Sequence, residues 1–346
     1  MKLTTRIVNL QLRHTFTIAR DSKDVSPVVI TEIEHDGIVG TGEACPNRYY
    51  NETPEAVAET LEGLSPWLAK KSPLAYEHFL DEAAERLGQH RGALSSLDLA
   101  TFDWVGRKLG QPLYRLLGLD PRRSPKSSYT IGIDSIDQMV EKIHEVPDFR
   151  IIKIKLGTPR DIEIVRALRD ETDAVFRVDA NCAWSVEETL EKSKELAALG
   201  VEFIEQPLPA DQLESMEEVY AKSTLPVIAD ENSVVPADVP RLSGKFHGIN
   251  IKLVKCGGIR PALRMVHLAR TLGMNIMLGC MVDSSVSATA ATHIGALMDY
   301  LDLDGPLLIT NDPYRGVEYV DAQPRPPDRP GLGVESRGAA PLSESA

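Results

Sequence analysis

The chain reads KIKLG at 153–157, VDAN at 178–181, IEQP at 204–207, ADEN at 229–232, NIK at 250–252, MLGC at 277–280 and DLDG at 302–305. Each of these segments ends a short apolar or β-branched run with a charged, polar or glycine-containing group. The six intervals between Lys155 and Asp302 cover 147 residues. The period is about 24.5 residues, which accommodates one strand, one helix and two loops, so we predict a stack of βα units.

Parallel strands that are joined by right-handed helical crossovers close into a barrel, with all strand C-termini on one rim. We predict strands at 128–133, 151–156, 174–179, 202–205, 226–230, 249–253, 275–279 and 300–303. We predict helices at 135–146, 159–171, 185–199, 211–222, 236–243, 259–272 and 284–298. No helical pattern follows the last strand. The predicted fold is therefore α/β, a (β/α)7β barrel that lacks its last helix.

The first third of the chain has a different organisation, with strands first and helices afterwards, which is typical of an α+β unit. Alternating residues predict a strand at 3–18, and a second and third strand at 27–42 around a turn at 35–37. A loop at 14–27 carries Arg20. Helical patterns follow at 53–70, 74–87 and 92–108, and a short turn at 113–119. We expect residues 1–120 to form this unit, 125–305 the barrel, 306–335 a return to the first unit, and 337–346 a flexible tail.

Composition excludes several classes of protein. The net charge of −13 argues against binding to nucleic acid or to an anionic membrane, both of which require a basic surface. No apolar run reaches the ~20 residues that span a bilayer, and the N-terminus has no signal-peptide core. The four cysteines show no CxxC spacing. We expect a reduced, cytoplasmic protein with unreactive thiols.

Three acidic residues, Asp179, Glu205 and Asp230, end three consecutive predicted strands. Carboxylates that meet on one rim repel each other unless a cation lies between them. A ligand set of oxygen atoms alone suits a hard ion, Mg²⁺ before Ca²⁺ or Mn²⁺. We therefore predict one magnesium site. The alternative is that each carboxylate forms a salt bridge or caps the helix that follows it.

Lys153 and Lys155 alternate on one strand, so both side chains point into the barrel while their apolar neighbours face the helices. Two close ammonium groups and burial both disfavour protonation, so we predict a lysine with a lowered pKa that acts as a general base. A pair of lysines that extends to solvent is the alternative. Lys252 shares the inward side of the sixth strand with Asn250, opposite the second strand. Lys155 and Lys252 would then face each other across the cavity, one removing a proton from a carbon and the other returning one.

Two further features belong to this rim. Lys255 competes with Lys252 for the second role, but it falls in the loop before Gly257 and Gly258, so we rank it lower. Asp302 and Asp304 alternate on the last strand beside the proposed ligands, and they require a cation of their own. This cation would be a second metal or the ammonium of a substrate; alternatively, both residues are structural acids or helix caps.

Taken together, these residues resemble the enolase superfamily. The resemblance covers nearly the whole chain, with the GxGEA segment at 40–44, the barrel motifs and PGLGVE at 330–335. The order KxK, Asp, Glu, Asp, NIK is similar to the subgroup of muconate lactonising enzymes, o-succinylbenzoate synthases and dipeptide epimerases. The DxD in DLDG and the GCM at 279–281 are similar to the dipeptide epimerases. One departure is Asn232, where serine is commoner.

The resemblance implies a modified TIM barrel with an N-terminal capping domain. It implies that Asp179, Glu205 and Asp230 bind one Mg²⁺ per subunit, that Lys155 and Lys252 are the two acid/base catalysts, and that Lys153 assists by its charge. Asp302 and Asp304 would bind the substrate ammonium. Arg20 resembles the arginine that meets the side-chain carboxylate in the Ala-Glu enzymes, the alternative being a solvated loop charge.

The implied activity is epimerisation of L-Ala-D-Glu and L-Ala-L-Glu, a step in murein peptide recycling. Hydrophobic or cationic dipeptides are alternative substrates. An o-succinylbenzoate synthase or N-acylamino acid racemase, a muconate cycloisomerase and a non-catalytic metal-dependent binder are alternative functions. The first three act on substrates without a free ammonium, which would leave Asp302 and Asp304 without a role. Pure binding would not need two opposed lysines. We also expect a homo-oligomer.

Overall fold

The alternating N-terminal residues form a three-stranded antiparallel sheet in the computed structural model, which describes residues 1–338. Its strands are β1 (Lys2–Ile18), β2 (Asp21–His35) and β3 (Ile38–Ala44), in that order. The predicted loop at 14–27 is wrong: Phe16 pairs with Lys23 and Ile18 with Asp21. The hairpin therefore continues to a tight turn at Ala19 and Arg20. The pairing register shifts between Gln11 and Phe16, so the strand continues through the segment that was predicted as a loop without a regular alternation.

Five helices follow this sheet: α1 (Pro54–Gly63), α2 (Ser65–Leu68), α3 (Tyr76–Leu87), α4 (Arg91–Leu109) and α5 (Leu113–Leu116). The single helix predicted at 53–70 is two helices, since Pro66 in the first turn of α2 lacks an amide hydrogen to continue α1. Helix α4 is buried on nearly all sides and packs directly on β3. A Cβ at Gly42 would lie 2.0 Å from the carbonyl oxygen of Ser96, so this contact requires glycine.

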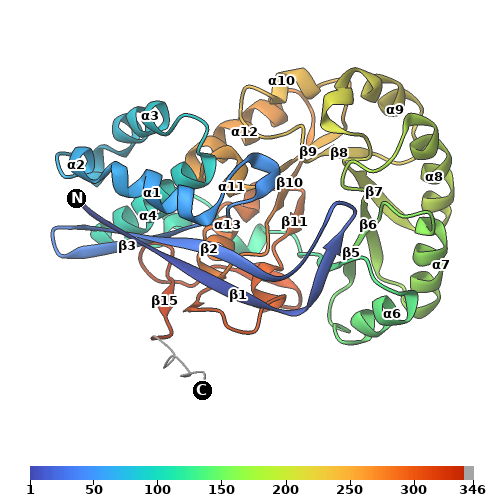
Figure 1. Ribbon diagram of the computed structural model, residues 1–346, viewed down its shortest axis with the longest axis horizontal. Helices are drawn as coiled ribbons and strands as arrows, with labels where there is room; N and C mark the ends of the chain where they lie inside the picture. Colours follow the sequence, from blue (N-terminus) through green and yellow to red (C-terminus); the bar gives the residue numbers. More distant parts are fainter. Residues whose placement is uncertain (339–346) are drawn as a thin grey trace.

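The second unit is a parallel sheet of eight strands. They are β4 (Tyr129–Ile131), β5 (Ile151–Lys155), β6 (Val175–Asp179), β7 (Val201–Glu205), β8 (Val227–Ala229), β9 (Gly248–Ile251), β10 (Asn275–Gly279) and β11 (Tyr300–Asp302). Neighbours in sequence are neighbours in the sheet. The two edges approach each other, since the amide of Ser128 donates to the carbonyl of Leu301 at 3.0 Å. The predicted (β/α)7β barrel is confirmed, with a helical layer outside the strands (Figure 1).

The helices of this outer layer are α6 (Ile136–His144), α7 (Asp161–Glu171), α8 (Val186–Ala198), α9 (Met216–Lys222), α10 (Val239–Leu242), α11 (Leu253–Cys256), α12 (Ile259–Thr271) and α13 (Ser285–Thr292). Most are a few residues shorter than predicted, and α11 was not predicted. A single 3-10 turn, η6 (Gly305–Leu307), follows β11, so the last strand has no long helix behind it.

The segment after the barrel contains four short strands: β12 (Tyr314–Arg315), β13 (Glu318–Val320), β14 (Gln323–Arg325) and β15 (Glu335–Ser336). It contacts the N-terminal unit at several places, and two backbone hydrogen bonds are examples. The amide of Arg13 donates to the carbonyl of Leu308, and the amide of Leu113 donates to the carbonyl of Gly331, both at 2.9 Å. The tail predicted at 337–346 lies, from residue 339 on, outside the described residues.

A buried carboxylate joins the two units. Glu43, at the end of β3, accepts hydrogen bonds from the amide of Ser284 at 2.9 Å and from the amide of Ser287 at 3.2 Å. Ser284 is the N-cap of α13 and Ser287 lies in its first turn, where a helix leaves its amides unpaired. The hairpin of β1 and β2 then extends over the barrel, with its tip near β5 and β6 (Figure 1). None of the helices among the described residues is long and apolar enough to cross a membrane.

Candidate active site

Asp179, Glu205 and Asp230 meet at the carboxyl ends of three neighbouring strands. Asp179 ends β6 and pairs in register with Glu205 at the end of β7, and Asp230 follows β8 directly. One carboxylate oxygen of each lies within 4.8 Å of the other two. All three side chains are buried. The regular βα spacing of the sequence therefore brings the three acids to one point.

Four lysine ammonium groups surround these acids. Lys153 Nζ lies 2.7 Å from Glu205 Oε2 and 2.9 Å from Asp302 Oδ2. Lys155 Nζ lies 2.7 Å from Asp179 Oδ2. Asp230 has two lysine partners, with Lys252 Nζ 2.8 Å from its Oδ2 and Lys255 Nζ 2.5 Å from its Oδ1. The acids and lysines therefore balance each other's charge inside one buried cluster. This pairing is needed because water does not solvate charges that are buried in the protein.

The predicted lowering of a lysine pKa is wrong for Lys153. Burial opposes its charge, but the carboxylates of Asp302, Glu205 and Asp179 outweigh burial and raise the pKa of Lys153. The pKa of Lys252 is also raised, by Asp230 against the effect of burial. The sequence argument counted the two neighbouring ammonium groups of one strand. It did not count the acids that the other strands bring to the same place.

The donor set fits a magnesium ion. Carboxylate oxygens are the ligands that this hard cation prefers, and the three acids provide them without histidine or cysteine. Burial and the nearby charge of Asp179 raise the pKa of Glu205 to about 7, so this carboxylate lacks full compensation. One buried oxygen, Asn181 Oδ1, accepts no hydrogen bond among the described residues, and Glu205 Oε2 has the ion pair with Lys153 as its contact. A cation at the triad would satisfy this excess of acceptors.

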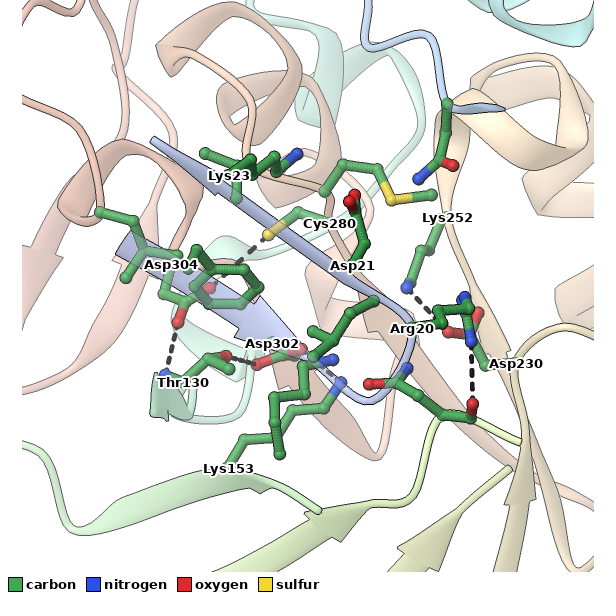
Figure 2. A pocket seen from close by; sticks show the side chains of 18 of the residues that line it. Arg20, Asp21, Lys23, Thr130, Lys153, Asp230, Lys252, Cys280, Asp302 and Asp304 are labelled. Atoms are coloured by element: carbon green, nitrogen blue, oxygen red, sulfur yellow. Dashed lines mark hydrogen bonds and ion pairs between the residues drawn. The ribbon is translucent and has the colours of Figure 1, made fainter. Parts of the chain in front are cut away.

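Lys155 and Lys252 line one cavity above the triad. Lys155 ends β5 and Lys252 follows β9, and three strands separate these two in the barrel order. In a closed barrel of eight strands, this spacing places the two side chains on opposite sides of the cavity. Figure 2 shows Lys252 beside Asp230, with the hairpin passing over the opening. The arrangement can present an amine to either face of a bound carbon atom.

Asp302 and Asp304 lie at one end of the cavity and differ in their partners. Asp302 pairs with Lys153 and accepts from Ser128 Oγ at 2.6 Å, and Lys153 outweighs burial to lower its pKa. Asp304 accepts from the amide of Thr130 at 2.6 Å. Burial and the charge of Asp302 raise the pKa of Asp304 to about 6. Of the two acids, Asp304 is therefore the one that can receive a cation from outside the protein.

Arg20 stands at the hairpin tip and lines the cavity. Its guanidinium pairs with Glu231 and donates to the carbonyl of Asn181 at 3.0 Å. The guanidinium carbon lies 4.4 Å from the centre of the Tyr49 ring. Glu231 raises the pKa of Arg20 against the effect of burial. Arg20 is therefore ion-paired at the cavity wall although it is partly exposed, and its contact with a substrate stays a prediction.

Sequence reasoning missed the role of Gln206, which follows Glu205 and is fully buried. Its Oε1 accepts from the amides of Asp230 at 3.0 Å and Asn232 at 3.2 Å, and its Nε2 donates to Asn232 Oδ1 at 2.7 Å. The side chain therefore joins the end of β7 to the residues around the third acid. Its backbone φ of 34° is uncommon for a residue other than glycine and indicates local strain. The only sequence signal was an amide directly after a predicted ligand.

Two family models match this chain, one in each of its two units. Residues 1–118 match the model described as "Mandelate racemase / muconate lactonizing enzyme, N-terminal domain". Residues 135–340 match the model described as "Enolase C-terminal domain-like". The first match covers the N-terminal sheet and its helices, and the second covers the barrel from α6 onward.

Relatives with assigned activities match over almost their full length. An L-Ala-D/L-amino acid epimerase of Flavobacterium johnsoniae is 47% identical over 93% of this chain and 95% of its own length. An L-Ala-D/L-Glu epimerase of Bacteroides thetaiotaomicron is 40% identical over 96% of this chain and 88% of its own length.

Solved structures are also similar to this chain over almost their full length. The L-Ala-D/L-Glu epimerase of Bacillus subtilis in a substrate-liganded complex superposes with a TM-score of 0.92 at 29% identity, over 97% of this chain and 99% of that one. The dipeptide epimerase of Methylococcus capsulatus, in complex with Mg and L-Arg-D-Lys, superposes with a TM-score of 0.89 at 34% identity, over 96% of this chain and 99% of that one.

Proposed function

The chain belongs to the mandelate racemase/muconate lactonizing enzyme family of the enolase superfamily, and we propose from this that it interconverts L-Ala-D-Glu and L-Ala-L-Glu. It is an isomerase that acts on dipeptides, as its relatives are, and its cofactor is Mg²⁺. The observation that carries the proposal is the pair of opposed lysines above an acidic triad, with Asp304 free to receive an ammonium.

The chain's own residues account for the proton transfer. The amine of Lys155 or Lys252 removes the proton on the Cα of the C-terminal residue, and the opposite lysine returns a proton to the other face. Lys153, which contacts Glu205 and Asp302, contributes positive charge at the bottom of the cavity. When bound at the triad, Mg²⁺ supplies the charge that stabilises the negative charge developing on the substrate carboxylate.

Binding would orient the dipeptide along the cavity. The substrate ammonium would lie at Asp304 and Asp302, and the substrate carboxylate would lie at the triad, on the other side of the two lysines. This orientation requires a free N-terminus. It therefore disfavours N-acylated and succinylated acids, and it disfavours muconate, which has no ammonium.

A D₂O exchange experiment tests the function. L-Ala-L-Glu incubated with the enzyme and Mg²⁺ in D₂O should gain one deuterium at the Cα of glutamate and form the other epimer, as measured by mass spectrometry and NMR. The control is N-acetyl-L-Ala-L-Glu, which should not exchange. Absence of exchange in every dipeptide of a library, together with exchange in N-acylated amino acids, would replace the proposal with a racemase of N-acylated substrates.

A broader dipeptide range is the second candidate. Two of the similar relatives are L-Ala-D/L-amino acid epimerases, at 47% and 43% identity. The cavity wall also contains the apolar side chains of Ile18, Met281 and Val282. Exchange in L-Ala-Leu or L-Ala-Met at rates near that of L-Ala-Glu would favour this candidate.

We further propose that this activity serves the recycling of murein peptides, in the cytoplasm and as a homo-oligomer. The support for recycling is that L-Ala-D-Glu occurs in such peptides, and the cytoplasmic location rests on the cysteine pattern. We also propose a capping domain at 1–120 and a barrel domain at 125–305, which the two family matches support.

A further inference from the structure

The cavity wall of the described chain carries five cationic side chains, and four of them already have a carboxylate partner. These four are Arg20 with Glu231, Lys153 with Glu205 and Asp302, Lys155 with Asp179, and Lys252 with Asp230. The fifth is Lys23. Among residues 1–338 it has no carboxylate within 4.0 Å, and its ammonium donates to Ser26 Oγ at 3.2 Å. A lysine has three donors, so two remain for another acceptor.

The charge of Arg20 is held by its partner. Glu231 is buried, with none of its side chain exposed, and a second oxygen of its carboxylate has no hydrogen bond among the described residues. Removal of Arg20 from this carboxylate would leave a buried charge without a partner, at a high cost in free energy. The carbonyl of Asn181 and the ring of Tyr49 fix the same guanidinium. Arg20 therefore behaves as part of the cavity wall, with a compensated charge.

Lys23 is placed where a bound side chain would meet it. It lies on β2, opposite Phe16, three residues after the hairpin tip. Figure 2 shows Lys23 at the upper edge of the cavity, above Cys280 and on the far side from Arg20. The acid next to it in the chain, Asp24, is exposed and accepts from Thr15 Oγ1 at 2.6 Å. Asp21 lines the cavity, is exposed, and accepts from the amide of Ser22 at 2.9 Å. The half-buried Lys23 therefore brings to the cavity a positive charge that no carboxylate of the described residues pairs with.

We propose that Lys23, and not Arg20, is the residue that recognises the side-chain carboxylate of the C-terminal residue of the dipeptide. This inference rests on the proposed function and names its specificity residue. A single flexible ammonium is a point charge without the planar geometry of a guanidinium. It selects for an acidic side chain and tolerates variation in its length. Glutamate and aspartate dipeptides are then both substrates, and neutral dipeptides of the same size are poorer ones.

Matched variants test this assignment with two isosteric substrates, L-Ala-L-Glu and L-Ala-L-Gln. The quantity measured is the ratio of their kcat/KM values. Lys23→Gln should lower this ratio about 10- to 100-fold, the range expected for loss of a hydrogen bond to a charged group. Lys23→Arg keeps the charge and should retain most of the ratio. Lys70→Gln removes an exposed lysine after α2 and should leave the ratio and the turnover unchanged.

Arg20→Gln provides the contrasting result. Because this change leaves Glu231 unpaired in the wall, it should reduce kcat/KM for both substrates by similar factors. A fall of the ratio in Arg20→Gln with no fall in Lys23→Gln would overturn the proposal and assign the recognition to Arg20. A wild-type enzyme that epimerises dipeptides without preference for L-Ala-L-Glu over L-Ala-L-Gln would also overturn it. The proposed function fails by a different result, the absence of exchange in all dipeptides.

Discussion

Lys155 and Lys252 differ from Lys153 in the number of acids that hold them. Lys153 contacts three carboxylates, those of Glu205, Asp302 and Asp179, whereas Lys155 and Lys252 each contact one. A lysine with three partners is fixed in place and balances charge. A lysine with one partner can turn toward a substrate when that partner binds a cation instead. The contacts therefore separate the two proposed bases from the lysine that assists them.

Removal of either lysine base should greatly slow epimerisation but leave proton exchange at the Cα of one epimer. We expect Lys155→Ala and Lys252→Ala each to lower epimerisation by about 10²- to 10⁴-fold, the usual contribution of a positioned acid or base. Because the two amines face opposite sides of the cavity, each variant should still exchange the Cα proton of one epimer in D₂O, and the two variants should retain opposite epimers. NMR of the separate L,L and L,D dipeptides measures this. Loss of exchange for the same epimer in both variants would contradict the two-base assignment.

The pKa of Asp304 makes a second prediction at this scale. Burial and Asp302 raise this pKa to about 6, and only the ionised carboxylate attracts the substrate ammonium. As the pH falls through 6, the acid takes up a proton, so the KM for the dipeptide should rise up to about tenfold per pH unit. Steady-state kinetics between pH 5 and 8 measure the effect.

Asp304→Asn is the variant that identifies the titrating group. Its KM should be high at every pH and should lack the rise below pH 6, while the protein keeps its Mg²⁺ affinity. A wild-type pH profile in the variant would assign the titration to another group. The sequence predicted an acid pair here, but it could not predict that Lys153 neutralises Asp302, since these residues are 149 positions apart.

At the scale of elements, the strands were the most predictable part of the structure. Apolar runs that end in polar residues placed all eight barrel strands, because a strand buried on both faces leaves that pattern. The hairpin was not predicted to its full length. Phe16 and Lys23 pair across it, but their segment alternates irregularly and contains Arg20 and Asp21. Polar residues at a strand end look like loop residues in a sequence, although here they form the edge of the cavity.

The connection after β8 depends on side chains that no periodicity reveals. Asn232 accepts from Gln206 Nε2 at 2.7 Å and donates to the carbonyl of Ala210 at 2.8 Å. We expect Asn232→Ala to free the Gln206 side chain and to loosen the backbone of Asp230. The apparent Kd for Mn²⁺, used as a probe for Mg²⁺, should rise about 10-fold or more, as is usual when the support of a ligand is removed. Electron paramagnetic resonance titration measures this Kd without turnover.

Asn9→Ala is the matched control for this titration, since Asn9 is exposed on β1 far along the chain from the triad. It should not change the Kd for Mn²⁺. Asn232→Ser keeps a short hydrogen-bonding side chain and should fall between the wild type and alanine. An unchanged Kd in Asn232→Ala would show that Gln206 alone positions the third acid.

At the scale of the whole molecule, separate units meet through buried polar groups. His293, after the end of α13, accepts from the amide of Tyr114 at Nδ1 and donates from Nε2 to the carbonyl of Leu332, both at 3.1 Å. It thereby joins the barrel, the N-terminal helices and the C-terminal segment. The spacing of the sequence could not predict this contact, because it links three regions of unrelated pattern. Only a neutral imidazole can make both hydrogen bonds, and burial lowers the pKa of His293 to about 4.

This pKa gives stability a pH dependence with a defined sign. The pKa of His293 in the folded state lies below the unfolded value of ~6.5, so the unfolded chain binds the proton more tightly. The stabilisation is complete above pH 6.5 and is lost as the pH falls from 6.5 to 4, by up to about 3 kcal/mol. Burial raises the pKa of Asp98 to about 7, which has the opposite effect: Asp98 favours the folded state as the pH falls. The total pH dependence therefore mixes both signs.

A comparison of variants isolates the contribution of His293. His293→Gln keeps a donor for the carbonyl of Leu332 but loses the acceptor for the amide of Tyr114, so it should destabilise the fold by about 1–3 kcal/mol at pH 7.5. Glutamine takes up no proton, so the difference in unfolding free energy between the wild type and the variant should shrink as the pH falls to 4.5. Asp98 is present in both proteins, so its effect cancels from this difference. Urea titrations at each pH measure it. His78→Gln, at an exposed position, should show no such trend. A constant difference across this range would mean that His293 does not couple the junction to protonation.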